Sequence, residues 1–241
     1  MDWLDFENDL VNKHIYTINN NSTKNIVLFG SCHMATIGFM INKLLDYNFN
    51  IHIIISWFFQ IKGIENFDMV DINNKIKNVV SNCDVFIYHM HIHDYHVDAS
   101  ILPSLVNDNC LKLIVPNYRL DYLDDNYSKS LHILNYHIEN SDFQEFKFVT
   151  ENHKNIMFFN TPYHPTHYLL FLQSKSIKNK IAKNGKIITI ESYFDEKNRS
   201  YFKKFKEFKK YYVNLPGING VDEKTSLATG ISTTADYFDL L

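Results

Sequence analysis

Short apolar runs alternate with stretches of helical periodicity along the first half of the chain. The first of these runs, 26–29, is continuous and apolar, which is typical of a strand buried on both faces. Four runs predict strands: 26–29, 49–55, 84–88 and 111–115. Apolar positions recur at helical spacing over 34–45 and 71–80, between these runs. Strands that alternate with helices predict an α/β domain with a mainly parallel sheet covered on both faces.

The second half of the chain is less regular. The run at 156–159 predicts a fifth strand, followed by a loop and by a helix from Tyr168 onward. A lysine-rich helix with an aromatic stripe is expected over 196–212. The predicted organisation is an N-terminal extension over 1–23, one α/β catalytic domain over 24–212, and a tail or linker over 213–241 that can lead to a further domain of a longer protein.

Composition narrows the classes of partner. The chain has 241 residues and a formal charge of -3, and Arg119 and Arg199 are its only arginines. A nucleic-acid-binding protein is expected to present a basic face and arginines that contact bases. We therefore expect no nucleic-acid partner, and a sugar, nucleotide or cofactor instead.

The cysteines and the hydropathy bear on the compartment. Three widely spaced cysteines do not predict a disulfide framework, so we expect a reducing compartment. The acidic start lacks the pattern of a signal peptide, and no run reaches the ~20 apolar residues that span a bilayer. The expected location is the cytoplasm of the source cell, or of an infected host if the source is viral.

The turn that follows the first predicted strand carries a reactive side chain. Residues 30–33 read Gly-Ser-Cys-His and enter a predicted helix. Cys32 in a first helical turn would meet free N–H groups, which favour a thiolate and can stabilise an oxyanion. The alternative is a small buried cysteine that packs beneath the turn.

Ligands of parallel α/β sheets bind at the carboxyl ends of the strands. His164 follows the late predicted strand, so we expect it at the same edge as Cys32, where it could act as base or ion-pair partner. A simple helix-entry loop is the alternative, and His167 is a weaker candidate. Arg119 follows another strand and could bind phosphate or carboxylate, although a surface ion pair fits equally well.

A histidine-rich segment follows the third predicted strand. Its imidazoles and carboxylate are zinc ligands by type, but no matched second ligand pair is evident. We expect pocket-lining histidines here rather than a metal site. The segment consists of His89, His91, His93, Asp94 and His96. Neither a dinucleotide-binding G-x-G-x-x-G loop nor a P-loop occurs.

Four short motifs occur in order along residues 24–185. They are GSCH at 30–33, DVFIYH at 84–89, PNYRLDY at 116–122 and TPYHPT at 161–166. Together they resemble the WcbI-type polysaccharide biosynthesis family, which is similar in fold to SGNH hydrolases. The resemblance implies an SGNH- or flavodoxin-like three-layer sandwich with a central, mainly parallel sheet. It also implies a coenzyme A-binding acetyltransferase that modifies sugars.

The resemblance assigns roles to individual residues. Cys32 matches the nucleophile position of the hydrolases and His164 their histidine, whereas Thr161 stands in place of an aspartate. His33 and His89 replace glutamines of the family pattern. The predicted oxyanion and pocket residues are Gly30, Ser31, His33, His89, His91, Asn117 and Thr161, and the predicted cofactor-binding residues are Tyr118, Arg119 and His167.

The favoured hypothesis is an acetyl-CoA-dependent acetyltransferase that acts on an amino or hydroxyl group of a sugar, with a nucleotide-linked amino sugar as the favoured acceptor. Acetyl-CoA is the expected cosubstrate, and no metal is expected. Cys32 could carry the acetyl group as a thioester, or His164 could deprotonate the acceptor for direct transfer. The alternatives are an SGNH-like sugar esterase or deacetylase and a non-catalytic nucleotide-sugar-binding domain.

Overall fold

The computed structural model describes residues 15–55, 69–90, 102–120, 127–153, 158–161, 164–183 and 185. It comprises two compact units. The first is Met1–Val115 with Ile177–Asn184, and the second is Pro116–Ser176 with Gly185–Leu241. The helix predicted over 196–212 and the predicted tail over 213–241 lie outside the described residues.

The first unit is built on a five-stranded sheet. Its strands are β1 Tyr16–Ile18, β2 Asn25–Gly30, β3 Asn50–Ile55, β4 Val85–His89 and β5 Leu111–Val115. Their order is β1-β3-β2-β4-β5. All neighbours pair in parallel except β1, which is antiparallel to β3. The four predicted strands and the mainly parallel sheet are therefore confirmed.

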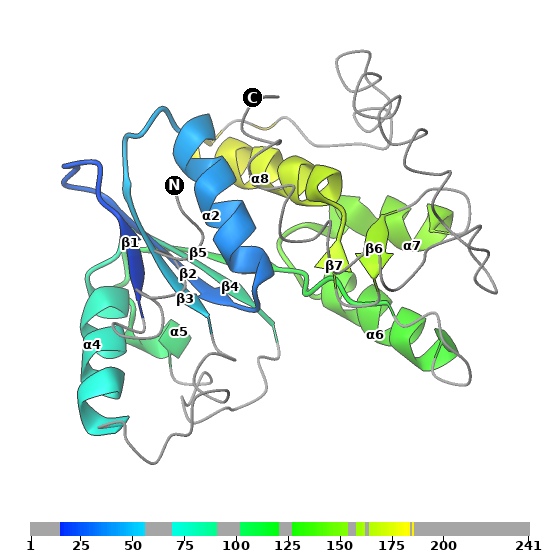
Figure 1. Cartoon of the computed structure of the whole chain (residues 1–241), viewed down its shortest axis with the longest axis horizontal. Helices are drawn as coiled ribbons and strands as arrows, with labels where there is room; N and C mark the ends of the chain where they lie inside the picture. Colours follow the sequence, from blue (N-terminus) through cyan, green and yellow to red (C-terminus); the bar gives the residue numbers. More distant parts are fainter. Residues whose placement is uncertain are drawn as a thin grey trace. The chain divides into compact units, whose positions relative to one another are not determined.

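Helices cover both faces of this sheet (Figure 1). They are α2 His33–Leu44, α4 Met69–Ser81 and the short α5 Leu102–Leu105. Gly38 of α2 packs so closely on β3 that an added Cβ would lie 2.7 Å from Ile53 Cδ1. On the opposite face, Phe29 and Phe86 share a buried cluster with Val80 of α4. Successive strand residues face opposite ways, so the two helical layers bury alternate positions of the same strands. The unit is a three-layer α/β structure.

The predicted N-terminal extension contributes a strand that sequence analysis missed. Tyr16 pairs with Ile53 along the free side of β3. Its ring meets the ring of Phe39 of α2 edge to face, with centroids 5.8 Å apart. A strand of three residues is too short to show the alternation of apolar and polar positions that predicts a strand, so the sequence did not indicate it.

The second unit combines helices with a small hairpin. Its elements are α6 Tyr127–Glu139, a 3-10 turn Gln144–Lys147, α7 Phe148–Asn152, β6 Phe159–Thr161, β7 His164–Pro165 and α8 His167–Ile181, the last as far as Ser176. The prediction of a fifth strand in the central sheet is wrong within the described residues. β6 pairs with β7 in a separate two-stranded antiparallel sheet.

Aromatic packing explains why residues near 158 are apolar without belonging to the large sheet. Phe158 and Phe159 are almost fully buried. The Phe148 ring lies 5.8 Å from that of Phe158 and 5.4 Å from that of Phe146, centroid to centroid. Each such burial contributes about 1.5–3 kcal/mol. Thr166 directly precedes α8, and its hydroxyl accepts the N–H of Leu169 at 3.2 Å.

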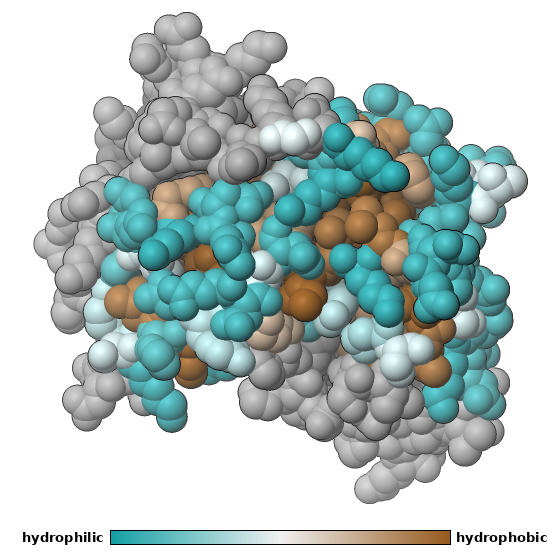
Figure 2. All heavy atoms as spheres, turned by 180° about the vertical axis from the view of Figure 1, so that it is seen from behind, coloured by the Kyte–Doolittle hydropathy of each residue, from teal (hydrophilic) through white to brown (hydrophobic). Residues whose placement is uncertain are grey.

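On the face drawn in Figure 2, polar side chains are interspersed with hydrophobic ones. The large hydrophobic residues that are exposed in the described ranges are Tyr47, Leu111, Ile133 and Tyr136. Among the described helices, none has the length and apolar character that crossing a membrane requires.

Candidate functional site

The candidate site lies where β2 ends and α2 begins. Gly30 closes the strand, and a side chain has no room there. A Cβ on Gly30 would lie 2.6 Å from His89 Nδ1 and 3.0 Å from Met34 Cγ. Glycine is therefore required by the close approach of the His89 ring and not by a special backbone conformation.

His89 ends β4, the strand next to β2, and is 2% exposed. The backbone N–H of Ser31 donates a hydrogen bond to its Nδ1, with 3.1 Å between the two nitrogens. Because Nδ1 accepts, the neutral ring carries its proton on Nε2. His89 is therefore set up as a hydrogen-bond donor through Nε2 while this bond stands.

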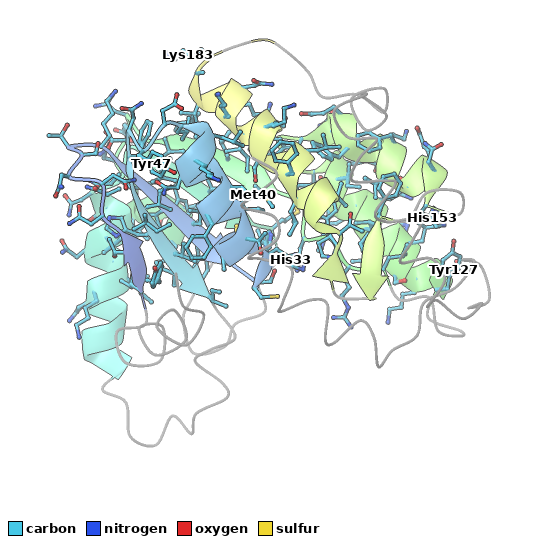
Figure 3. All side chains as sticks on the ribbon, turned by 45° about the horizontal axis from the view of Figure 1, so that its top comes forward. His33, Met40, Tyr47, Tyr127, His153 and Lys183 are labelled. Atoms are coloured by element: carbon cyan, nitrogen blue, oxygen red, sulfur yellow. The ribbon has the colours of Figure 1, made fainter. Side chains whose placement is uncertain are left out.

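His33 is the first residue of α2, at the end of the helix that meets the turn (Figure 3). It is buried, and its ring lies edge-on to that of His89, with centroids 5.8 Å apart at 75°. Strand β4 and helix α2 thus bring two imidazoles to one turn, from positions 56 residues apart in the sequence.

The backbone of the turn is largely committed to internal hydrogen bonds. Met34 N–H donates to the Ser31 carbonyl, and Ala35 N–H donates to the Cys32 carbonyl, both at 3.0 Å. The Ser31 N–H is engaged by His89. The N–H groups of Cys32 and His33 both act to lower the pKa of the Cys32 thiol. The Ser31 N–H is not a vacant donor for an oxyanion, because His89 occupies it.

Cys32 is partly exposed and is a free thiol. Burial of its sulfur raises the pKa of the thiol to about 11, against the two backbone hydrogen bonds, which act to lower it. The prediction that this turn favours a thiolate is wrong in its net direction. The backbone contribution has the expected sign, but the loss of solvation outweighs it.

Ser31 supplies a further polar group to the turn. Its side-chain Oγ is buried and has no hydrogen-bond partner among the residues that the structure describes. A buried hydroxyl without a partner costs stability and is rare in folded proteins, except where water or a ligand completes it. This hydroxyl is adjacent in sequence to Cys32.

The remaining predicted residues are placed as follows. Tyr118 is fully buried in the second unit, and its hydroxyl donates to Gln173 Oε1 at 2.6 Å. It is a core residue with no surface for a cofactor, which corrects its predicted contact. Arg119 is exposed. The carbonyl oxygen of Asn117 lies 3.3 Å from His137 Nδ1.

The structure gives the backbone positions of the late motif. Thr161 and His164 are paired residues of the β6–β7 hairpin, and His167 opens α8. His164 therefore lies within a strand rather than after one. Cys32 belongs to the first unit and His164 to the second, so their pairing stays a prediction.

Two contacts of histidine were not predicted. Tyr127 and His153 of the second unit are hydrogen-bonded (Figure 3). The Ser31–His89 bond was also missed, although the sequence held a clue. Parallel pairing of β2 with β4 sets Phe29 beside Tyr88, so the residues that follow them, Gly30 and His89, must meet.

No group of three or more metal-ligating side chains is found within the described ranges. His91, His93, Asp94 and His96 lie outside those ranges. No protein-family model matches the sequence, and no curated protein matches it. The residues brought together in one unit are Gly30, Ser31, Cys32, His33 and His89.

Proposed function

We propose that this chain transfers the acetyl group of acetyl-CoA to a hydroxyl or amino group of a sugar, with a nucleotide-linked amino sugar as the favoured acceptor. The acetyl group leaves the coenzyme A sulfur, the sugar oxygen or nitrogen takes it up, and the acceptor proton is released. The four motifs and their order support this activity, as does an α/β sheet with a cysteine turn at the carboxyl end of β2.

The observation that carries the proposal is the environment of the Cys32 sulfur. Two backbone N–H groups, from Cys32 itself and from His33, act to lower the pKa of this thiol and so favour negative charge beside it. The neighbouring Ser31 hydroxyl is buried without a hydrogen-bond partner among the described residues. His89 carries a proton on Nε2, as argued above from the Ser31 bond. The turn thus gathers neutral donors, which suit an acyl carbonyl that gains negative charge during transfer.

The raised pKa of Cys32 supports direct transfer over a covalent acetyl-cysteine. A thiol with a pKa of about 11 is protonated at neutral pH. The protonated thiol is an S–H donor. In direct transfer, Cys32 donates a hydrogen bond to the acetyl carbonyl oxygen, and the acceptor attacks the carbonyl carbon.

Steady-state turnover with acetyl-CoA and a panel of nucleotide-linked amino sugars tests the proposal. Acetylated sugar is measured by mass spectrometry and free coenzyme A by thiol titration. Removing one oxyanion donor costs about 10²–10³ in kcat, so Cys32→Ala should lose about 10²-fold and Cys32→Ser, which keeps a donor, should lose less than about tenfold. Equal loss in both variants, with an acetyl group trapped on wild-type Cys32, would replace direct transfer by the covalent route.

His89 offers a matched control pair. In His89→Gln the amide oxygen can still accept the Ser31 N–H, so turnover should be largely retained, whereas His89→Ala should lose both that bond and the Nε2 donor. Release of acetate from an acetylated sugar without coenzyme A would identify an esterase instead. Sugar binding that survives loss of Cys32 and His89, with no turnover, would identify a binding domain.

A further inference from the structure

Two further cysteines approach each other at the opposite edge of the sheet. Cys83 precedes β4 and Cys110 precedes β5, and these neighbouring strands run in parallel with Val85 beside Leu111. Their sulfur atoms are 3.4 Å apart. A disulfide needs about 2.0 Å between the sulfurs, so a small local movement would bring the two into bonding distance.

The surroundings of the pair suit a disulfide. Cys83 is 1% and Cys110 is 8% exposed, and both belong to one apolar cluster that includes Val80 and Leu102. A disulfide removes two S–H donors from this cluster without adding charge. Cys110 is the more accessible of the two, so a small oxidant would reach it first.

The two sulfurs differ in the ease with which they ionise. The Cys83 sulfur lies 3.0 Å from the Val80 carbonyl oxygen, and a carbonyl dipole disfavours a thiolate there. The hydrogen bond between the two sulfurs raises the pKa of Cys83, and burial raises it further. The same bond lowers the pKa of Cys110, and Lys112 lowers it further while burial opposes. Cys110 is therefore the thiol that ionises first and attacks.

We propose that Cys83 and Cys110 form a reversible intramolecular disulfide when the protein meets a peroxide. The Cys110 thiolate attacks one peroxide oxygen, the O–O bond breaks, and the hydroxide released takes up a proton to give water. Cys83 sulfur then attacks the Cys110 sulfenic acid, the S–S bond forms, the S–O bond breaks, and a second water leaves. Two thiols are oxidised and one peroxide is reduced to two waters.

Thiol titration in denaturant, after treatment of the whole chain with hydrogen peroxide and quenching, tests the proposal. The chain has three cysteines. The titre should fall from three thiols to one, and dithiothreitol should restore it. Peptide mapping without reductant should give a cross-linked peptide that joins Cys83 to Cys110 within one chain.

Variants separate this pair from Cys32. In Cys32→Ser the titre should fall from two to zero with the same cross-link, and Cys83→Ser or Cys110→Ser should give no such cross-link. The proposal is overturned if oxidation is confined to Cys32, if it joins separate chains, if Cys110 reaches sulfinic acid while Cys83 stays reduced, or if all three thiols survive. The wild-type map decides among these outcomes even if a serine variant fails to fold.

Discussion

Gly30→Ala is the substitution that probes the site most sharply. The new Cβ would lie 2.6 Å from His89 Nδ1, whereas ordinary contact begins near 3.4 Å. The ring must therefore retreat by about 0.8 Å, and Met34 Cγ, 3.0 Å from the same Cβ, is also closer than ordinary contact. That movement takes Nδ1 out of range of the Ser31 N–H, now 3.1 Å away. The alanine therefore strains the core and breaks a buried hydrogen bond.

The cost can be worked out from these two effects. Overpacking a buried site costs about 1–3 kcal/mol, and a buried acceptor left without its donor costs about 1–3 kcal/mol. Since the two overlap, we expect the free energy of unfolding to fall by about 2–4 kcal/mol. Urea unfolding measures this loss as a lower midpoint concentration of urea, with an unchanged dependence of the unfolding free energy on urea concentration.

A double-mutant cycle identifies the cause. In His89→Ala the ring that the new methyl group would strike is absent. Adding Gly30→Ala to His89→Ala should therefore cost at least about 1 kcal/mol less than adding it to the wild type. Equal costs in both backgrounds, or a Gly30→Ala midpoint indistinguishable from that of the wild type, would refute the close approach of Gly30 and His89.

Three other predictions concern the same unit. Gly38→Ala should destabilise by about 1–2 kcal/mol despite better helix propensity, because its Cβ would lie 2.7 Å from Ile53 Cδ1. Adding Ile53→Val, which removes that atom, should recover part of the loss in urea unfolding, and strictly additive costs would contradict the contact. Burial lowers the pKa of His52, so the native state resists protonation of this ring. The free energy of unfolding should be at its full value above about pH 6.5 and should decrease as the pH falls toward the lowered pKa. A His52→Gln variant with the same pH dependence would argue against this. At neutral pH, iodoacetamide should alkylate Cys32 about 20-fold more slowly in the native protein than in the unfolded chain. The native thiol has a pKa of about 11, so a smaller fraction of it is thiolate, and the greater nucleophilicity of a more basic thiolate offsets only part of that loss. A rate that already levels off between about pH 9 and pH 10 would mean that the thiol ionises like a free cysteine, whose pKa is about 8.5.

The central sheet was predictable because its strands are apolar runs that stand out in the sequence. A strand covered on both faces must be apolar at every position, and 26–29 satisfies this. The turn at Gly30 followed from the switch between that run and helical spacing. Ligands bind parallel sheets at the carboxyl ends of the strands, and this rule predicted Cys32 and His89 as site residues together.

Other features depend on packing between distant segments. Phe159 is apolar because of an aromatic core, and the same pattern would serve a central strand. The approach of Cys83 to Cys110 arises from the register of β4 with β5, which no local pattern contains. The pKa of Cys32 depends mainly on how deeply its sulfur is buried. The sequence predicts only that a helix terminus lies beside it.

Binding of acetyl-CoA tests the central claim most directly. A ligand that binds the native state raises its stability, by about 2.7 kcal/mol at one hundred times the dissociation constant. Thermal unfolding of the whole chain should therefore shift upward with acetyl-CoA, and with free coenzyme A, and should not shift with a matched adenine nucleotide that lacks the thiol arm. No shift with any coenzyme A species at millimolar concentration would contradict the proposed acetyl transfer.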